Sequence, residues 1–186
     1  MTRFGGKVVS VELVATSRAW GEAAIIASVL GASGLGYLTI ARRLIDVTVD
    51  MSAAAILPVS TVVFARVRSE EGRLRAVYLR ALGASYGTVS FPLMLVAVTA
   101  PIVVPLVFGD GWGQSVPVAQ AFALAGVLTL GAALDHGLFY GLGRPGAWLT
   151  YAIAVDGLTI GTTALVVSGG VEAIALGFLG VALVAT

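Results

Sequence analysis

Apolar residues fill six long runs of this sequence, separated by short stretches rich in glycine or charge. A helix needs about 20 apolar residues to cross a bilayer. Glycine-rich turns at 31–34 and 109–113 and the charged stretch 66–75 interrupt the runs. The pattern therefore predicts an all-α fold, a six-helix transmembrane bundle forming one domain over 1–186. The expected helices are 9–30, 35–65, 76–100, 116–140, 147–167 and 171–186.

Two ends of these runs are irregular. The third run continues past Pro101 and Pro105 to Phe108, so we expect its far end to be kinked or to leave the membrane obliquely. The sixth run is short for a span, and the sequence stops inside it. We therefore expect a truncated last helix and a fragment of a longer protein.

The composition excludes an ordinary soluble domain. Of the 186 residues, 58% are hydrophobic and 11% are charged, whereas soluble domains average about 25% charged residues. The net charge of +1 gives no reason to expect nucleic acid as a partner. Cysteine is absent, and we find neither a phosphate-binding glycine loop nor a metal-ligand spacing. We expect no enzyme, no cofactor and no metal ion.

Basic residues lie at alternate ends of the predicted helices. The opposite ends, at 31–34, 109–115 and 168–170, contain no lysine or arginine. Because lysine and arginine accumulate on the cytoplasmic side of membrane proteins, we predict a multi-pass protein with a cytoplasmic N-terminus. The basic ends carry Arg3, Lys7, Arg66, Arg68, Arg73, Arg75 and Arg144.

The second run carries four charged residues on one side of its helix. Arg42, Arg43, Asp46 and Asp50 fall within an arc of about 100°. A charge at the bilayer centre costs at least about 3 kcal/mol, so this arc should face protein or water. Arg42 can pair with Asp46, four residues on, whereas Asp50 needs another cation. The arc favours Arg42 over Arg43 as a cavity residue.

The first run offers a matching polar face. Arg18 and Glu22 lie four residues apart, and Glu12 is on the same side of the helix. We expect the two charged faces to meet. Two interpretations stay open: structural ion pairs that join two helices, or a hydrated cavity whose arginines bind an anionic head group.

Three further polar residues interrupt later runs. Asp135 and His136 precede Arg144 by less than three turns, so they mark either a helix end near the head groups or a proton relay. Asp156 lies about ten residues from either end of its helix and next to several threonines. We expect it to face another helix or a cavity.

Several short motifs resemble those of polysaccharide-biosynthesis export proteins. Their order and spacing are similar to the second half of the lipopolysaccharide and O-antigen flippases in the multidrug/oligosaccharidyl-lipid/polysaccharide exporter superfamily. Val62 replaces a proline usual in that family, with Pro58 one turn earlier. The motifs are Leu30–Tyr37, Ala41–Leu44, Phe64–Arg66, Arg73–Tyr78, Phe91–Met94, Val104–Gly109, Trp112 and Gly141–Pro145.

The resemblance implies a function and a set of partners. Such flippases have two lobes, 12–14 helices in all, and move undecaprenyl-diphosphate-linked oligosaccharides across the bacterial cytoplasmic membrane by alternating access. This chain would be the C-terminal lobe, working with a missing N-terminal lobe or a second copy. Arg18 and Arg42 would attract the diphosphate, while Glu22, Asp46 and Asp50 would balance those charges or couple to an ion.

Two alternatives remain from the sequence. A multidrug exporter of the same superfamily would use the acidic residues to bind cations. A non-transporting scaffold or remnant would use the polar faces only to hold helices together.

Overall fold

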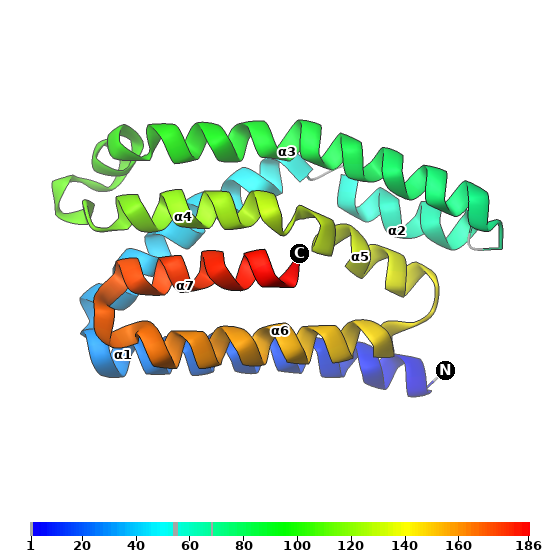
Figure 1. Ribbon diagram of the computed structural model, residues 1–186, viewed down its shortest axis with the longest axis horizontal. Coiled ribbons are helices and arrows are strands. Elements are labelled where there is room, and N and C mark those ends of the chain that lie inside the picture. The colour runs from blue at the N-terminus through cyan, green and yellow to red at the C-terminus, as the bar shows by residue number, and fades with distance from the viewer. Residues whose placement is uncertain (1, 54–55, 68) are drawn as a thin grey trace.

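The computed structural model describes residues 2–53, 56–67 and 69–186, and this part of the chain is helical without strands (Figure 1). The predicted all-α bundle is confirmed. Short 3₁₀ turns, η1 (Asp110–Trp112) and η2 (Val167–Gly169), connect some of the helices. The helices are α1 (Thr2–Ala53), α2 (Ile56–Val67), α3 (Glu71–Phe108), α4 (Ser115–Leu128), α5 (Leu130–Gly141), α6 (Pro145–Val166) and α7 (Gly170–Ala185).

Helix α1 consists of two helical halves that meet at Gly31. This residue has φ 70° and ψ −172°, which is not helical, and only glycine adopts that backbone region without strain. The chain reverses there, so the second half runs back across the bundle toward α3 (Figure 1). The expected turn at 31–34 is therefore present. The helix expected over 35–65 comprises the second half of α1 and most of α2, with residues 54–55 outside the described part.

Helix α3 is longer than the sequence predicted. It begins at Glu71, inside the charged stretch expected to be a loop, and continues through Pro92, Pro101 and Pro105 to Phe108. The helix expected over 76–100 therefore begins earlier, and the expected continuation of its run to Phe108 is part of the same helix. In hydrocarbon, ending the helix early would leave several backbone groups without hydrogen bonds, whereas each proline removes only one N–H donor. The helix therefore continues to the turn at Gly109.

The fourth predicted helix is broken at Thr129. Helices α4 and α5 form a pair bent by 44° at this residue, so the expected single helix 116–140 is wrong. The Thr129 hydroxyl donates to the carbonyl oxygens of Ala125 (3.0 Å) and Gly126 (3.4 Å). Bonding of a threonine hydroxyl back to the preceding turn favours such a bend.

Three stretches of the described chain are long and apolar enough to span a membrane: Val9–Ser52, Gly72–Phe108 and Pro145–Ala185. The α4–α5 pair is a fourth if it counts as one broken span. The first and third stretches each fold back at a glycine with positive φ, Gly31 and Gly170, so α7 returns beside α6 (Figure 1). Large apolar side chains such as Phe91 (71% exposed) cover the outside. The protein is a polytopic membrane bundle.

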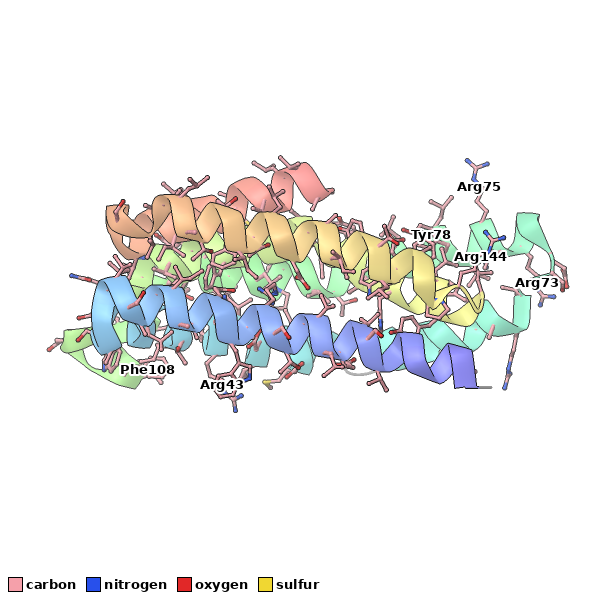
Figure 2. All side chains as sticks on the ribbon, turned by 90° about the horizontal axis from the view of Figure 1, so that it is seen from below. Arg43, Arg73, Arg75, Tyr78, Phe108 and Arg144 are labelled. Atoms are coloured by element: carbon pink, nitrogen blue, oxygen red, sulfur yellow. The ribbon has the colours of Figure 1, made fainter. Side chains whose placement is uncertain are left out.

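Arginines gather at one end of the bundle. Arg73, Arg75 and Arg144 lie together at one end, whereas Phe108 lies at the other (Figure 2). The N-terminus is at the arginine-rich end (Figure 1). The helix ends that carry these basic residues thus lie on the same side of the bundle. That this side faces the cytoplasm stays a prediction. The side chains of Arg3, Lys7 and Arg68 lie outside the described residues.

The reversal at Gly31 gives a test of the fold. Nothing lies within 4 Å of a Cβ built on Gly31, so a Gly31→Ala change meets no clash and strains only the backbone. We expect it to cost about 1–3 kcal/mol of stability, measured as thermal denaturation of the purified protein in detergent. Gly87→Ala is the control, because that helical glycine is equally uncrowded and has no positive φ; equal melting of the two variants would contradict the prediction.

Candidate functional site

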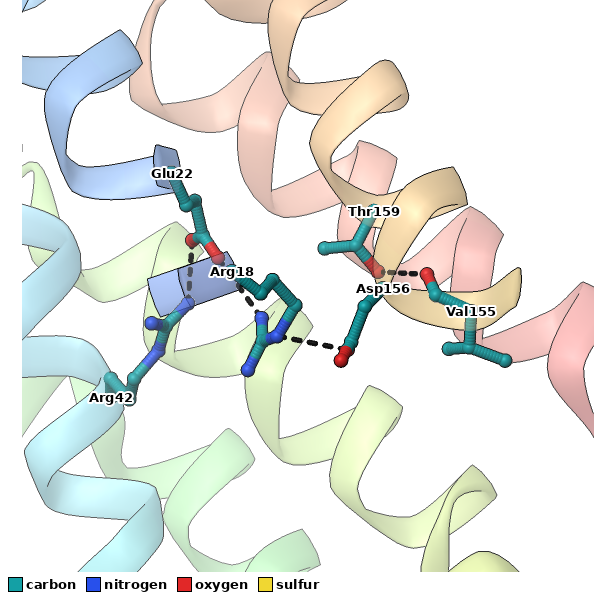
Figure 3. Close-up of polar contacts among 6 residues, drawn as sticks. All are labelled: Arg18, Glu22, Arg42, Val155, Asp156 and Thr159. Carbon is teal, nitrogen blue, oxygen red and sulfur yellow. Dashed lines mark hydrogen bonds and ion pairs between the residues drawn. The ribbon is translucent and has the colours of Figure 1, made fainter. Parts of the chain in front are cut away.

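Glu22 is the buried centre of a chain of charges. It lies in the first half of α1, and the residue is 1% exposed. Its Oε2 accepts a hydrogen bond from Arg18 Nη1 at 3.0 Å, and its Oε1 accepts one from Arg42 Nη2 at 2.8 Å (Figure 3). Arg42 comes from the second half of α1, so this carboxylate joins the two halves across the reversal at Gly31. The two charged faces predicted from the sequence do meet.

The chain of charges extends to α6 through Arg18. Arg18 Nε lies 3.0 Å from Asp156 Oδ1, which makes an ion pair between α1 and α6 (Figure 3). We call Arg42, Glu22, Arg18 and Asp156 the charge network. It contains two cations and two anions, so it is neutral as a whole, and it links both halves of α1 to α6.

Two phenylalanine rings hold Arg42 from the other side. Its guanidinium carbon lies 5.6 Å from the ring centre of Phe122 on α4 and 5.5 Å from that of Phe178 on α7. The two rings meet edge to face, with centres 5.3 Å apart. A planar guanidinium over aromatic faces makes a cation–π contact, so this position suits arginine better than lysine. Sequence reasoning missed both rings.

The charge network borders a cavity of about 520 Å³. Arg18, Arg42, Asp46 and Asp156 all line it. Ligand pockets usually have volumes of about 300–1,000 Å³, with a few polar groups in an apolar wall. A smaller cavity of about 220 Å³ lies between the two halves of α1, lined by Glu22, Thr39, Arg42, Arg43 and Asp46.

The second half of α1 differs in one respect from the sequence prediction. Arg42 was expected to pair with Asp46, but within the described residues its ion pair is with Glu22. The physical reason is burial: Glu22 is enclosed and needs a cation, whereas Asp46 is exposed. Arg43 and Asp50 are also exposed, and Arg43 points outward from the bundle (Figure 2).

Asp135 and His136 do not face the same way. Tyr78 on α3 donates a 2.8 Å hydrogen bond to Asp135 Oδ1. The His136 ring instead packs against Tyr140 and Trp148, with centres 4.2 and 5.2 Å away. Consecutive helical residues point about 100° apart, and here they face different helices. Neither residue lines the 520 Å³ cavity, so the proposed relay is not brought together with the charge network.

Comparison with known proteins identifies the family of this chain. The sequence pattern of the family described as "Polysaccharide biosynthesis protein" matches residues 1–117, which include Arg18, Glu22 and Arg42. The chain belongs to this family.

Among curated proteins, lipopolysaccharide biosynthesis protein WzxC of Escherichia coli (strain K12) is 30% identical over 105 residues. That match covers 56% of this chain and 21% of WzxC, so the aligned part is about a fifth of the relative's length. No solved structure matches the chain.

The charge network predicts that neutralising Glu22, its buried carboxylate, strongly lowers the stability of the protein. Glu22→Gln leaves Arg42 without its ion pair, so we expect a loss on the order of 3 kcal/mol in stability. The double change Glu22→Gln/Arg42→Gln should recover part of that loss, because no unpaired charge then remains at this end. Thermal denaturation in detergent measures both. Glu12→Gln, at an exposed position on the same helix, is the matched control; a Glu22→Gln protein as stable as this control would show that the network does not hold the fold together.

Proposed function

We propose that this chain is one lobe of an exporter for lipid-linked oligosaccharides in cell-surface polysaccharide biosynthesis. It would work in the bacterial cytoplasmic membrane by alternating access, with a cytoplasmic N-terminus. One observation carries the proposal: Arg18 and Arg42 reach a 520 Å³ cavity from apolar helices of a membrane bundle. Membership of the polysaccharide biosynthesis family supports the choice of substrate.

The arginines have the chemistry to bind a diphosphate. Guanidinium groups bind phosphate oxygens through paired N–H donors. Arg42 donates to Glu22 through Nη2, and Arg18 donates to Glu22 through Nη1. Arg18 Nε forms an ion pair with Asp156 but no hydrogen bond, so each arginine keeps further N–H groups for a ligand. Undecaprenyl diphosphate would therefore bind between the two arginines, beside the exposed carboxylate of Asp46, which we propose takes part in coupling to an ion.

A cationic substrate fits this site less well. Glu22 would be the most buried anion for such a ligand, but both of its oxygens already accept from arginines. A cation would have to displace one of them. The pairing of Glu22 thus favours an anionic substrate over the cations of a multidrug exporter.

The exposed charges of α1 indicate a second lobe. Arg43, Asp46 and Asp50 are exposed within the apolar stretch Val9–Ser52. In lipid each would cost at least about 3 kcal/mol. We propose that they face a hydrated path between this lobe and another, supplied by a longer chain or by a second copy.

Export assays test the role of the arginines. In cells that depend on this protein for surface polysaccharide, Arg18→Gln or Arg42→Gln should lower export about tenfold or more, because a hydrogen bond to a charged group contributes roughly 1.5–3 kcal/mol. Export is expressed per amount of protein in the membrane, because either change also removes an ion-pair partner of the buried Glu22. Arg75→Gln is the control, because that exposed arginine lies at the arginine-rich end and lines neither cavity (Figure 2). Undiminished export by both cavity variants would remove the arginines from the substrate site.

Accessibility separates a transporter from a scaffold. The chain has no cysteine, so a single Asp46→Cys side chain can be probed with membrane-impermeant thiol reagents. We expect it to react, because a hydrated cavity admits such reagents, whereas Phe91→Cys on the lipid-facing surface should not. If neither variant reacts with the reagent, helix packing would be the only role of these charges.

A further inference from the structure

The cavity beside the charge network has a second, chemically different wall along α6. Trp148, Tyr151, Asp156 and Thr159 all line it, and their spacing places them on one face of the helix. At 1.5 Å per residue, Trp148 lies about 12 Å along α6 from Asp156. Since α6 begins next to Arg144, Trp148 is on the side of the arginine-rich end (Figure 2). The charged residues and the Trp148 ring therefore line the cavity at different positions along α6.

The Trp148 ring is fixed by other aromatic rings. His136 packs against it edge to face at 5.2 Å, Tyr151 lies 5.1 Å away and Phe139 lies 6.4 Å away. These rings come from α5 and α6, so both helices hold the indole in place. Trp20, by contrast, is 75% exposed on the outside of the bundle, as expected for a tryptophan that faces lipid. Trp148 faces the cavity.

The hydroxyl groups that line this cavity are left as acceptors. Tyr151 donates its proton to the carbonyl oxygen of Ala185 (3.1 Å), Thr159 to that of Val155 (2.8 Å) and Thr129 to that of Ala125. Each hydroxyl oxygen retains lone pairs that can accept hydrogen bonds. The carboxylate of Asp156 adds further acceptors. The wall thus suits a ligand with one apolar face and many O–H donors at its rim.

A pyranose sugar has this combination of groups. Its axial C–H bonds form an apolar face that can stack on an aromatic ring, and its hydroxyls project around the edge. We propose that Trp148 is the stacking platform of a sugar subsite, which binds the sugar nearest the diphosphate while Arg18 and Arg42 bind the phosphates. The inference rests on the proposed function and adds the position of the sugar: toward the arginine-rich end from the charge network.

Fluorescence of Trp148 tests the subsite directly. The chain has three tryptophans, so Trp20→Phe/Trp112→Phe leaves Trp148 as the only reporter. The protein is purified in a sugar-free detergent and titrated with undecaprenyl-diphosphate-linked oligosaccharide or with undecaprenyl diphosphate. We expect the sugar-bearing lipid alone to shield Trp148 from acrylamide quenching. A matched protein that keeps only Trp20, made by Trp112→Phe/Trp148→Phe, should respond to neither lipid.

Binding measurements separate the subsite from the diphosphate site. Trp148→Ala should weaken binding of the sugar-bearing lipid by about tenfold, as for other rings stacked on an aromatic side chain, and Trp148→Phe should weaken it less. Neither change should alter binding of undecaprenyl diphosphate, whereas Arg42→Gln should weaken both lipids.

The outcomes distinguish failure of this inference from failure of the proposed function. If both lipids bind to the unaltered protein but Trp148 gives no response, the sugar subsite is wrong and the diphosphate site stands. Equal losses for the two lipids in both Trp148 variants would show a purely structural role and also overturn the subsite. If neither lipid binds to the unaltered protein, the proposed function fails as well.

Discussion

The burial of the Glu22 carboxylate is the constraint on which this arrangement depends. A carboxylate that is 1% exposed in an apolar bundle is tolerated only when cations and hydrogen bonds compensate it. One partner, Arg18, comes from its own helix, and the other, Arg42, comes from beyond the reversal at Gly31. Arg18 in turn requires Asp156 on α6. One buried charge thus sets the relative position of three helical segments and places two arginines at a cavity.

The helices and turns were largely predictable because the signals for them are local. A run of apolar residues ended by glycines defines a helix and its reversal, as at Gly31. The break at Thr129 was not predictable in this way, since the hydroxyls of Thr99 and Thr159 bond back to the preceding turn in the same manner without breaking their helices. The helix α3 continues through Pro101 and Pro105 because unpaired backbone groups are costly in lipid. The usual expectation that proline ends a helix comes from soluble proteins, where water can pair with the freed backbone groups.

The site was predictable only where its contacts are short-range in sequence. The Arg18–Glu22 pair follows from a four-residue spacing. The Arg42–Glu22 pair spans 20 residues. The sequence also offered Asp46, four residues from Arg42, as a partner, and the burial of Glu22 decided between the two. Phe122, Phe178 and Trp148 lie in apolar runs and carry no signal that separates them from neighbours. Asp135 and His136 are adjacent in a helix and therefore point about 100° apart, but which neighbouring helix each one faces depends on the helix packing.

The neutrality of the charge network has a consequence for transport. If a diphosphate binds the remaining N–H groups of Arg18 and Arg42 as proposed, its negative charge competes with Glu22 and Asp156 for the two guanidinium groups. Binding would then weaken ion pairs within the protein as it forms ion pairs to the ligand. Because Arg18 links α1 to α6 and Arg42 links the two halves of α1, occupancy would weaken contacts between helices as it gains contacts with substrate. A ligand shifts a conformational equilibrium only by its different affinity for the two states, and this exchange of partners supplies such a difference.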